Sequence, residues 1–173
     1  MRATVTTLGP TTPNERPAAP RRATFFGTAF HKVSGRNQVA IPRNLMKTLE
    51  ESNEGQLLLM RWNDEGFLRL YTQTQLDTII DSIRQRQDLD EATKAELVAH
   101  LSGSAEPIEP DKQGRFVLPA AWVDQLGMRE EVAFCGAFNR IELWPAEARR
   151  DYDQKKSARM AETASKITGL LNL

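Results

Sequence analysis

Cysteine, long apolar runs and net charge are all scarce in this 173-residue sequence. The single cysteine, Cys135, excludes an internal disulfide framework and favours a reducing compartment. No apolar run approaches the roughly 18 residues of a membrane span, and the N-terminus lacks the apolar segment of a secretory signal. We therefore expect a cytoplasmic protein without a membrane partner. The 23 basic and 23 acidic side chains cancel, which taken alone argues against a nucleic-acid-binding protein.

Catalytic and metal-binding motifs are missing as well. The sequence contains no GxSxG, P-loop or GxGxxG pattern, and its carboxylates are scattered over helical segments. His31 and His100 have no cysteine or acid at ligand spacing, which argues against zinc. Cys135 lies in the apolar run VAFC, where a buried thiol is the expected state. We therefore predict no enzyme activity, no metal, no cofactor and no small-molecule substrate.

The zero net charge is an average over unlike segments. Residues 1–43 carry seven basic side chains and one acid, whereas residues 76–109 carry three basic side chains and eight acids. Such asymmetry allows a local site for a polyanion on a neutral protein. The acidic stretch is equally well explained as the solvated face of helices.

Hydropathy and turn signals divide the chain into five parts. Residues 1–22, rich in Thr, Pro and Arg, predict a flexible basic tail. A first half over 23–73 is expected to contain a strand at 23–30, a short strand at 38–41, a helix at 43–51 that Pro42 opens, and a hairpin at 56–72. Apolar spacing in 74–104 predicts a helical connector with a second helix beginning near Asp88 or Asp90. The last two parts are a second half at 105–147 and a C-terminal helix or tail at 148–173.

The second half repeats the first. The segment EPIEPDKQGRFVLPAAWVDQLG aligns without a gap to AFHKVSGRNQVAIPRNLMKTLE at an offset of 77 residues, so that Pro119 corresponds to Pro42. The run VAFCGAFNRIELW then repeats the hairpin with a shorter connection. Each repeat of about 50 residues is too small for an ample core of its own, so we expect the two halves to pack together as a pseudo-twofold unit.

The loop that opens the second half carries the most specific pattern, Asp111-Lys112-Gln113-Gly114-Arg115. Gly114 suits a tight turn because glycine adopts backbone angles closed to other residues. Asp111 is placed to accept hydrogen bonds from turn amides or from the guanidinium of Arg115. An arginine held in this way is able to bind a phosphate or the edge of a guanine. A plain Asp–Arg surface pair is the alternative.

With two such half-repeats in register, the segment from Phe25 to Tyr152 resembles the MraZ family, whose members carry two tandem AbrB-like (SpoVT/AbrB) halves with Asp-x-x-x-Arg loops. The specific parts are DKQGRFVLPAAWVDQLG and IELWPAE. The resemblance implies an α+β fold, a small β-rich barrel of two pseudosymmetric βαββ halves, with helices between and after them. It also implies a ring-shaped homo-oligomer that binds double-stranded DNA as a transcriptional regulator. Its sites are direct repeats upstream of the division and cell-wall gene cluster, in the cytoplasm and associated with the nucleoid. No catalytic activity, metal or cofactor is implied.

The first loop departs from the family pattern. Alignment places Ser34 opposite Asp111, Asn37 opposite Gly114 and Gln38 opposite Arg115. Either Arg36 replaces the missing positive charge, or Gln38 contacts an adenine edge while Arg36 and Lys32 contact phosphates. His31, beside this loop, is expected to contact DNA or the turn. Arg21 and Arg22 are either a basic arm for DNA or part of an inert tail.

The resulting set of candidate residues falls into two groups. DNA contacts are predicted for Arg115, Lys112, Gln113, Arg36, Gln38, Lys32 and Asn37, and loop-structuring roles for Asp111, Gly114, Ser34 and Gly35. Other classes of function remain open: an AbrB-like antitoxin or transition-state regulator that holds a protein partner through the C-terminal segment, or a nucleoid-associated scaffold. A ring that repeats the loops would turn weak single contacts into tight binding.

Overall fold

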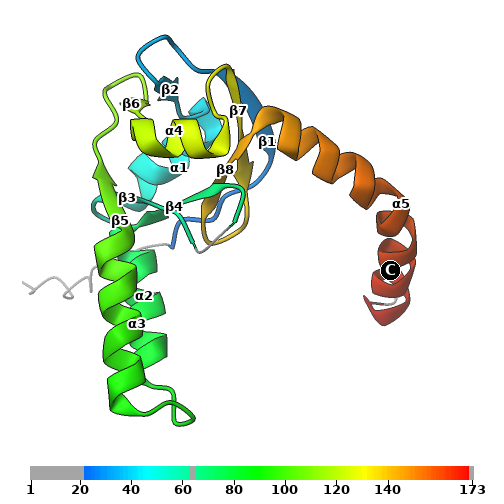
Figure 1. Cartoon of the computed structure of the whole chain (residues 1–173). Coiled ribbons are helices and arrows are strands. Elements are labelled where there is room, and N and C mark those ends of the chain that lie inside the picture. The colour runs from blue at the N-terminus through cyan, green and yellow to red at the C-terminus, as the bar shows by residue number, and fades with distance from the viewer. Residues whose placement is uncertain (1–21, 63–64, 172–173) are drawn as a thin grey trace, which may run out of the picture.

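The computed structural model describes residues 22–62 and 65–171, and within these residues the chain forms a mixed α+β fold of eight strands and five helices (Figure 1). The first half contributes β1 (Thr28–Lys32), β2 (Gln38–Ala40), α1 (Arg43–Ser52), β3 (Leu57–Met60) and β4 (Leu68–Thr72). Two helices follow, α2 (Gln73–Arg84) and α3 (Glu91–Ser104). The second half contributes β5 (Ala105–Ile108), β6 (Arg115–Val117), α4 (Ala120–Leu126), β7 (Glu131–Gly136) and β8 (Ile141–Pro145), and α5 (Ala146–Leu171) ends the described chain.

The main sheet joins strands of both halves. Its order is β1-β7-β8-β4-β3-β5, with every neighbouring pair antiparallel. A separate two-stranded ladder pairs β2 with β6, also antiparallel. Each half therefore gives its first strand to the other: β1 pairs with β7, and β5 pairs with β3. In the two repeats β1 corresponds to β5, β3 to β7 and β4 to β8. Replacing each strand by its counterpart gives the same strand order in reverse, which is the sign of twofold pseudosymmetry.

The strand registers show the same twofold pseudosymmetry as the strand order. In the ladder of β2 and β6, Val39 pairs with Phe116, its own counterpart at the offset of 77 residues. In the main sheet Arg69 of β4 pairs with Glu142 of β8, and the flanking pairs Leu68–Leu143 and Leu70–Ile141 exchange with each other. A pseudo-twofold axis thus passes through the Val39–Phe116 and Arg69–Glu142 pairs.

The main core lies between the six-stranded sheet and a layer made of β2, β6, α1 and α4 (Figure 1). Val39 and Phe116 point into it from the ladder, and Leu45 and Val123 point into it from the two helices. A Pro precedes each helix: Pro42 stands at the N-cap of α1 and Pro119 at that of α4. Proline suits this end of a helix because its missing N–H would have no partner there.

The opposite face of the sheet is covered by the base of a helical hairpin. Leu58, Met60 and Tyr71 pack against Leu76 of α2 and Leu101 of α3. All four residues of β3, LLLM, are therefore buried, since each face of this strand has a cover. Asp90 caps α3 by accepting from the amide of Thr93 at 2.9 Å, as its position in the sequence predicts.

Two helical arms extend from this body. The α2–α3 hairpin points away from the ladder of β2 and β6, and α5 leaves the sheet in a different direction (Figure 1). No helix in the described part of the chain has the length and apolarity needed to cross a membrane.

Three expectations need correction or fall outside these residues. The ladders within residues 22–62 and 65–171 leave β1 and β5 as sheet edges, so no closed barrel is found. The first strand begins at Thr28 rather than at residue 23, because Phe25 makes only an isolated bridge, to Phe138. The predicted tail at 1–22 lies outside the described residues except for residue 22.

Candidate nucleic-acid interface

The loop at residues 111–115, here called loop 2, is organised by one carboxylate. Oδ1 of Asp111 accepts from the main-chain amides of Gln113 and Arg115, both at 2.9 Å. The amide of Gly114 donates to the Asp111 carbonyl at 2.8 Å, and Gly114 has a φ of +75°. A side chain at position 114 would be strained by this φ and would place its Cβ 3.3 Å from the carbonyl oxygen of Ile41.

The second carboxylate oxygen fixes the arginine. Oδ2 of Asp111 lies 2.8 Å from both Nε and Nη2 of Arg115. The main-chain N–H of Arg115, and after it the guanidinium, hold the pKa of Asp111 below its ordinary value. The Arg115 side chain is 46% exposed. One edge of the guanidinium is therefore committed to Asp111, while Nη1 makes no hydrogen bond within the described part of the chain, so this half-exposed side chain is able to meet an acceptor from outside.

The loop at residues 34–38, here called loop 1, has the same backbone with different side chains. Oγ of Ser34 accepts from the amides of Arg36 at 3.4 Å and Gln38 at 3.2 Å, the positions served by Asp111 in loop 2. Asn37 adopts a φ of +56°, matching Gly114. The amide of Asn37 donates to the Ser34 carbonyl at 2.9 Å. Ser34 has no second oxygen, so Gln38 lacks the side-chain anchor that Asp111 gives to Arg115.

Each loop also bonds to the other half. The amide of Ile41 donates to the Gly114 carbonyl and the amide of Leu118 donates to the Asn37 carbonyl, both at 2.9 Å. These bonds extend the ladder of β2 and β6, so both loops flank a single ribbon, defined here as β2 and β6 together. Its buried face consists of Val39 and Phe116.

The outer face of the ribbon carries the predicted contact residues. Arg115 pairs across the ladder with Ala40, and Gln38 pairs with Val117. Arg115 and Val117 are exposed, the latter to 58%. A two-stranded ribbon of this kind is narrow enough to enter the major groove of DNA. The structure thus brings Arg115, Gln38 and the two loops to one end of the molecule.

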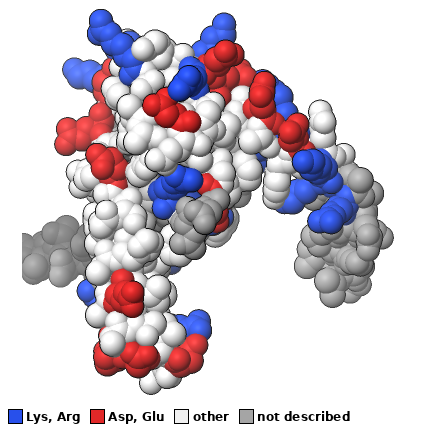
Figure 2. Space-filling model, viewed as in Figure 1, with Lys and Arg blue, Asp and Glu red and all other residues white. Residues whose placement is uncertain are grey.

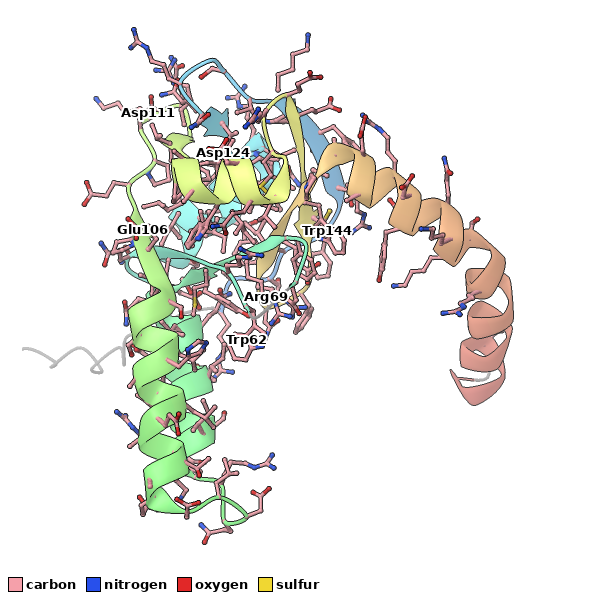
Figure 3. The ribbon with its side chains drawn as sticks, in the orientation of Figure 1. Trp62, Arg69, Glu106, Asp111, Asp124 and Trp144 are labelled. Carbon is pink, nitrogen blue, oxygen red and sulfur yellow. The ribbon has the colours of Figure 1, made fainter. Side chains whose placement is uncertain are left out.

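The surface charge is segregated along the long dimension of the molecule. Figure 2 shows Lys and Arg side chains gathered at the end that carries the ribbon and its loops, together with some acids, and mainly acidic side chains at the tip of the α2–α3 hairpin. In Figure 3 Asp111 lies near that first end, whereas Trp62, Arg69 and Trp144 lie on the opposite side of the sheet. The acids at the tip of the α2–α3 hairpin therefore lie away from the ribbon, whereas Glu106 on β5 and Glu109 directly precede loop 2.

A groove beside loop 2 contains residues that the sequence motif does not include. It has a volume of about 680 Å³ and runs between the loop and α1. Lys112 and Gln113 line it from the loop, and Arg43, Asn44 and Lys47 line it from the helix. The only signal for these helix residues in the sequence is that they occupy the polar face of an amphipathic segment. Their approach to loop 2 depends on the contact between Gly114 and Ile41, which joins the two halves.

Other candidates have structural roles. Nδ1 of half-buried His31 lies 2.7 Å from the Ala40 carbonyl oxygen, and its ring packs edge-on against Phe134. His31 therefore contacts β2 and the sheet rather than the turn, and its contact with DNA stays a prediction. Cys135 is buried, and burial raises the pKa of its thiol. Trp144 stacks on Phe67 with ring centroids 4.2 Å apart.

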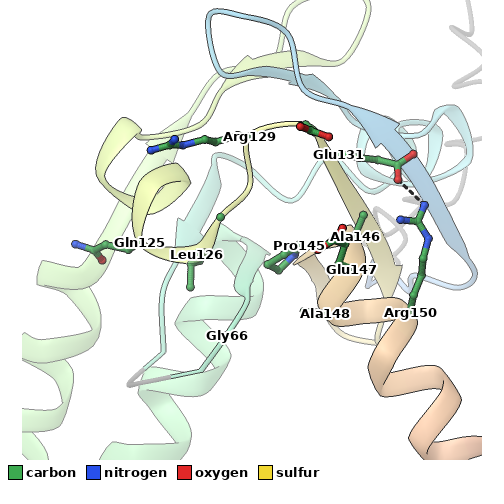
Figure 4. Close-up of a pocket in the computed structure, with 12 residues that line it drawn as sticks. Gly66, Gln125, Leu126, Arg129, Glu131, Pro145, Ala146, Glu147, Ala148 and Arg150 are labelled. Atoms are coloured by element: carbon green, nitrogen blue, oxygen red, sulfur yellow. Dashed lines mark hydrogen bonds and ion pairs between the residues drawn. The ribbon is translucent and has the colours of Figure 1, made fainter.

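No group of three or more potential metal ligands occurs among the described residues. Another hollow, of about 700 Å³, lies where α4, β7, β8 and α5 meet (Figure 4). Its charged groups include the ion pair between Glu131 and Arg150, whose charges neutralise each other. No residue of β2 or β6 lines this hollow.

Comparison with known proteins identifies relatives along most of the chain. A family model described as "MraZ protein, putative antitoxin-like" matches residues 101–170. A protein named Transcriptional regulator MraZ from Paenarthrobacter aurescens (strain TC1) is 29% identical over 139 residues, which is 80% of this chain and 93% of the relative. Proteins of the same name from Arthrobacter sp. (strain FB24) and Leifsonia xyli subsp. xyli are 27% and 28% identical over 84% and 83% of the chain, and 99% and 96% of their own lengths. Over most of its length the chain is therefore similar to proteins of the MraZ family.

The match to the MraZ model is uneven along the chain. It begins within α3 and ends within α5, so it includes loop 2 and leaves loop 1 outside. Loop 1 is also the loop in which Ser34 and Gln38 depart from the Asp-x-x-x-Arg pattern of the MraZ family. The two loops thus differ in chemistry although their backbones correspond.

Proposed function

We propose that this chain is a sequence-specific DNA-binding transcriptional regulator whose DNA-contacting element is the ribbon of β2 and β6 with its two loops. The observation that carries the proposal is the position of Arg115, fixed by Asp111 on one edge and half-exposed to solvent. The curated relatives are named transcriptional regulators, which supports the same conclusion. The two halves, at 23–73 and 105–147, each contribute one strand and one loop to this DNA-contacting element.

Arg115 is the residue best suited to read a base. Its guanidinium presents a planar pair of donors, the arrangement that matches O6 and N7 of guanine. Because Asp111 already orders the side chain, less conformational entropy is lost when DNA binds. Gln38 occupies the equivalent place and is suited to N6 and N7 of adenine.

The remaining loop residues supply backbone contacts. Lys112 and Gln113 precede Arg115 in loop 2, Arg36 precedes Gln38 in loop 1, and Lys32 ends β1 just before loop 1; all four are exposed. Such side chains set the position of a protein on the duplex without reading its sequence. Asn37 belongs to this group through its place in loop 1. Gly114 allows the turn of loop 2 through its φ of +75°, whereas Gly35 has no positive φ and a Cβ there would meet no atom within 4 Å.

A single subunit offers few phosphate contacts, and we infer that the working form is a homo-oligomeric ring. Binding strength depends on the number of phosphates neutralised, and copies of the ribbon at fixed spacing raise the effective concentration of each contact. Direct repeats in the DNA match such spacing. We place these repeats upstream of the division and cell-wall gene cluster, and the protein in the cytoplasm and on the nucleoid.

An antitoxin-like role is the second candidate. The description of the matching family model, which ends in "antitoxin-like", favours it, and α5 is a 26-residue helix that extends from the body. A regulator of this kind would hold a protein partner through α5 while the ribbon binds DNA. Purification with a bound toxin would support this role, and purification as a homo-oligomer alone would favour the first.

The test is a footprint on duplex DNA from upstream of the protein's own gene, run over a series of salt concentrations. The wild type is expected to protect short repeated sites, and Arg115→Ala is expected to lose protection while keeping its oligomeric state. Arg84→Ala is the matched control, since Arg84 is an exposed arginine on α2, far along the chain from either loop. Unchanged protection by Arg115→Ala would contradict the assignment of the ribbon.

A further inference from the structure

The positions that line the groove between loop 2 and α1 have counterparts beside loop 1, and the two sets of side chains differ in charge. At the offset of 77 residues Arg43 corresponds to Ala120, Lys47 to Asp124 and Lys112 to Gly35. The groove beside loop 2 is lined by three cations and one acid, Glu50. The corresponding positions beside loop 1 hold one cation, Arg36, and one acid, Asp124.

The cations of this groove are available to a ligand. Arg43, Lys47 and Lys112 are exposed, and none of the ion pairs among the described residues includes Arg43 or Lys112. Lys47 lies 3.5 Å from Glu51, with both side chains about 70% exposed, so water screens that pair. On the other side Asp124 accepts from Arg129 at 2.8 Å, which leaves this α4 position without free positive charge.

One side of the groove is formed by the same turn that positions Arg115, the arginine proposed to contact a base. Lys112 and Gln113 belong to the turn that Asp111 holds together, and Arg115 leaves the same turn into β6. The turn rests on α1, because Gly114 is bonded to Ile41 and a Cβ at position 114 would lie 3.6 Å from the side chain of Met46. A duplex that meets Arg115 with a base edge therefore brings its backbone toward the groove.

Resting on the proposed function, we propose that this groove is a binding site for the phosphodiester backbone of DNA, and that the counterpart positions beside loop 1 are not. The amides of Asn44 and Gln113 supply neutral donors, and Arg43, Lys47 and Lys112 supply the positive charge.

This site fixes the direction in which the protein lies on DNA. A ribbon with equivalent ends and equivalent flanks would bind a site equally well after rotation by half a turn about its pseudo-twofold axis. Unequal phosphate contacts on the two flanks make one orientation stronger. A fixed orientation is what successive subunits need in order to read direct repeats in the same sense.

The experiment measures the salt dependence of binding to the duplex that the footprint defines. Each phosphate contact contributes about 0.9 to the slope of log K against log salt concentration. Lys47→Gln and Arg43→Gln are expected to lower the slope by about 0.9 each, while Arg84→Gln, which removes the same charge from α2, is expected to leave it unchanged. Asp124→Lys, which places a cation in the counterpart position, is expected to raise it by a similar amount.

Ethylation interference locates the same contacts on the DNA. In the wild type, ethylated phosphates are expected to block binding more strongly on one flank of the guanine that Arg115 contacts. Lys47→Gln should lose part of that flank, and Asp124→Lys should add interference on the opposite flank. Equal interference on both flanks in the wild type, or a Lys47→Gln slope equal to that of Arg84→Gln, would overturn the groove assignment.

The two proposals fail in different ways. Absence of protected sites with the wild type would reject the proposed function and the groove with it. Protected sites that depend on Arg115 but whose salt slope is insensitive to Lys47 and Arg43 would reject the groove alone. Thermal unfolding of each variant serves as the check on folding, since both positions are exposed and away from the core.

Discussion

Loop 1 and loop 2 have the same main-chain hydrogen bonds and unlike side chains. Ser34 and Asp111 accept from corresponding amides, and Asn37 and Gly114 share a left-handed backbone. Only Asp111 has a second oxygen, and with it the loop 2 arginine is held in place. The difference teaches that the ladder of the ribbon specifies the loop backbone, whereas the loop side chains specify what each end of the ribbon is able to bind.

The strongest way to break the comparison is to remove the anchored arginine. Arg115→Ala is expected to weaken specific DNA binding by about 10- to 100-fold, since a bidentate base contact contributes roughly 1–3 kcal/mol. Gln38→Ala should cost less, because Gln38 is not held by a carboxylate. Titration of the footprinted duplex by fluorescence anisotropy measures both. A larger loss from Gln38→Ala than from Arg115→Ala would reverse the ranking of the two loops.

Substitutions at the turn positions Gly114 and Asn37 compare the two loops through the free energy of unfolding. Gly114→Ala is expected to lower the free energy of unfolding by about 1–2 kcal/mol, because a residue with a Cβ is strained at this left-handed φ and the Cβ approaches the carbonyl of Ile41. Asn37→Gly in loop 1 should change it by less than about 0.5 kcal/mol, since asparagine already tolerates this region. Thermal or denaturant unfolding gives both free-energy changes. Equal changes for Gly114→Ala and Asn37→Gly would show that the strain at the two turns is not equivalent.

Converting one loop toward the other tests whether side chains alone account for the difference. Gln38→Arg combined with Ser34→Asp is expected to move the preference at the contacted base from adenine toward guanine. The salt slope of binding should stay close to that of the wild type, because the added arginine and the added aspartate leave the net charge unchanged. Binding to a panel of duplexes with substitutions at that position checks the shift. No change in base preference would mean that the loop 1 end of the ribbon stays away from the DNA.

The smallest expected difference between the loops is in how stability depends on pH in the acid range. The depressed pKa of Asp111 means that its contribution to folding is complete above the unfolded pKa of about 3.9 and is lost as the pH falls through the lower folded value. Asp111→Asn is therefore expected to lose less stability than the wild type between about pH 5 and pH 3. Ser34→Ala should keep the wild-type pH dependence, because a hydroxyl does not titrate there. Denaturant midpoints at the two pH values provide the measurement.

Much of the local structure follows from the sequence because local signals specify it. The spacing of Leu76, Ile79, Ile80 and Ile83 predicts α2. Asp88 and Asp90 are the two predicted starts of α3, and the structure selects Asp90. The apolar run at 57–60 and the following run predict the hairpin of β3 and β4. The sequence places the beginning of β1 too early because ATFFGTAF alternates loosely and is aromatic from its start, and only its pairing with β7 selects Thr28–Lys32 as the strand.

The candidate site is predictable in part for the same reason. Asp111, Gly114 and Arg115 lie within five residues of one another, so turn chemistry alone relates them. The surroundings of His31 could not be predicted in this way, because its partners Ala40 and Phe134 come from other strands. Arg43 and Lys47 have no motif, and nothing short of the packing of α1 under loop 2 associates them with Arg115.

By itself the sequence determined the internal repeat, the helices and the chemistry of the two loops. It also determined that the second half carries the recognisable Asp-x-x-x-Arg pattern. Only the tertiary structure decided that the halves exchange their first strands, that β2 and β6 form one ribbon, and that a cationic groove flanks one end of it. Neither half is able to bury its apolar faces alone. Strands and helices distant in sequence are therefore brought together by the common core, and this packing, rather than the net charge of zero, sets where positive charge meets the ribbon.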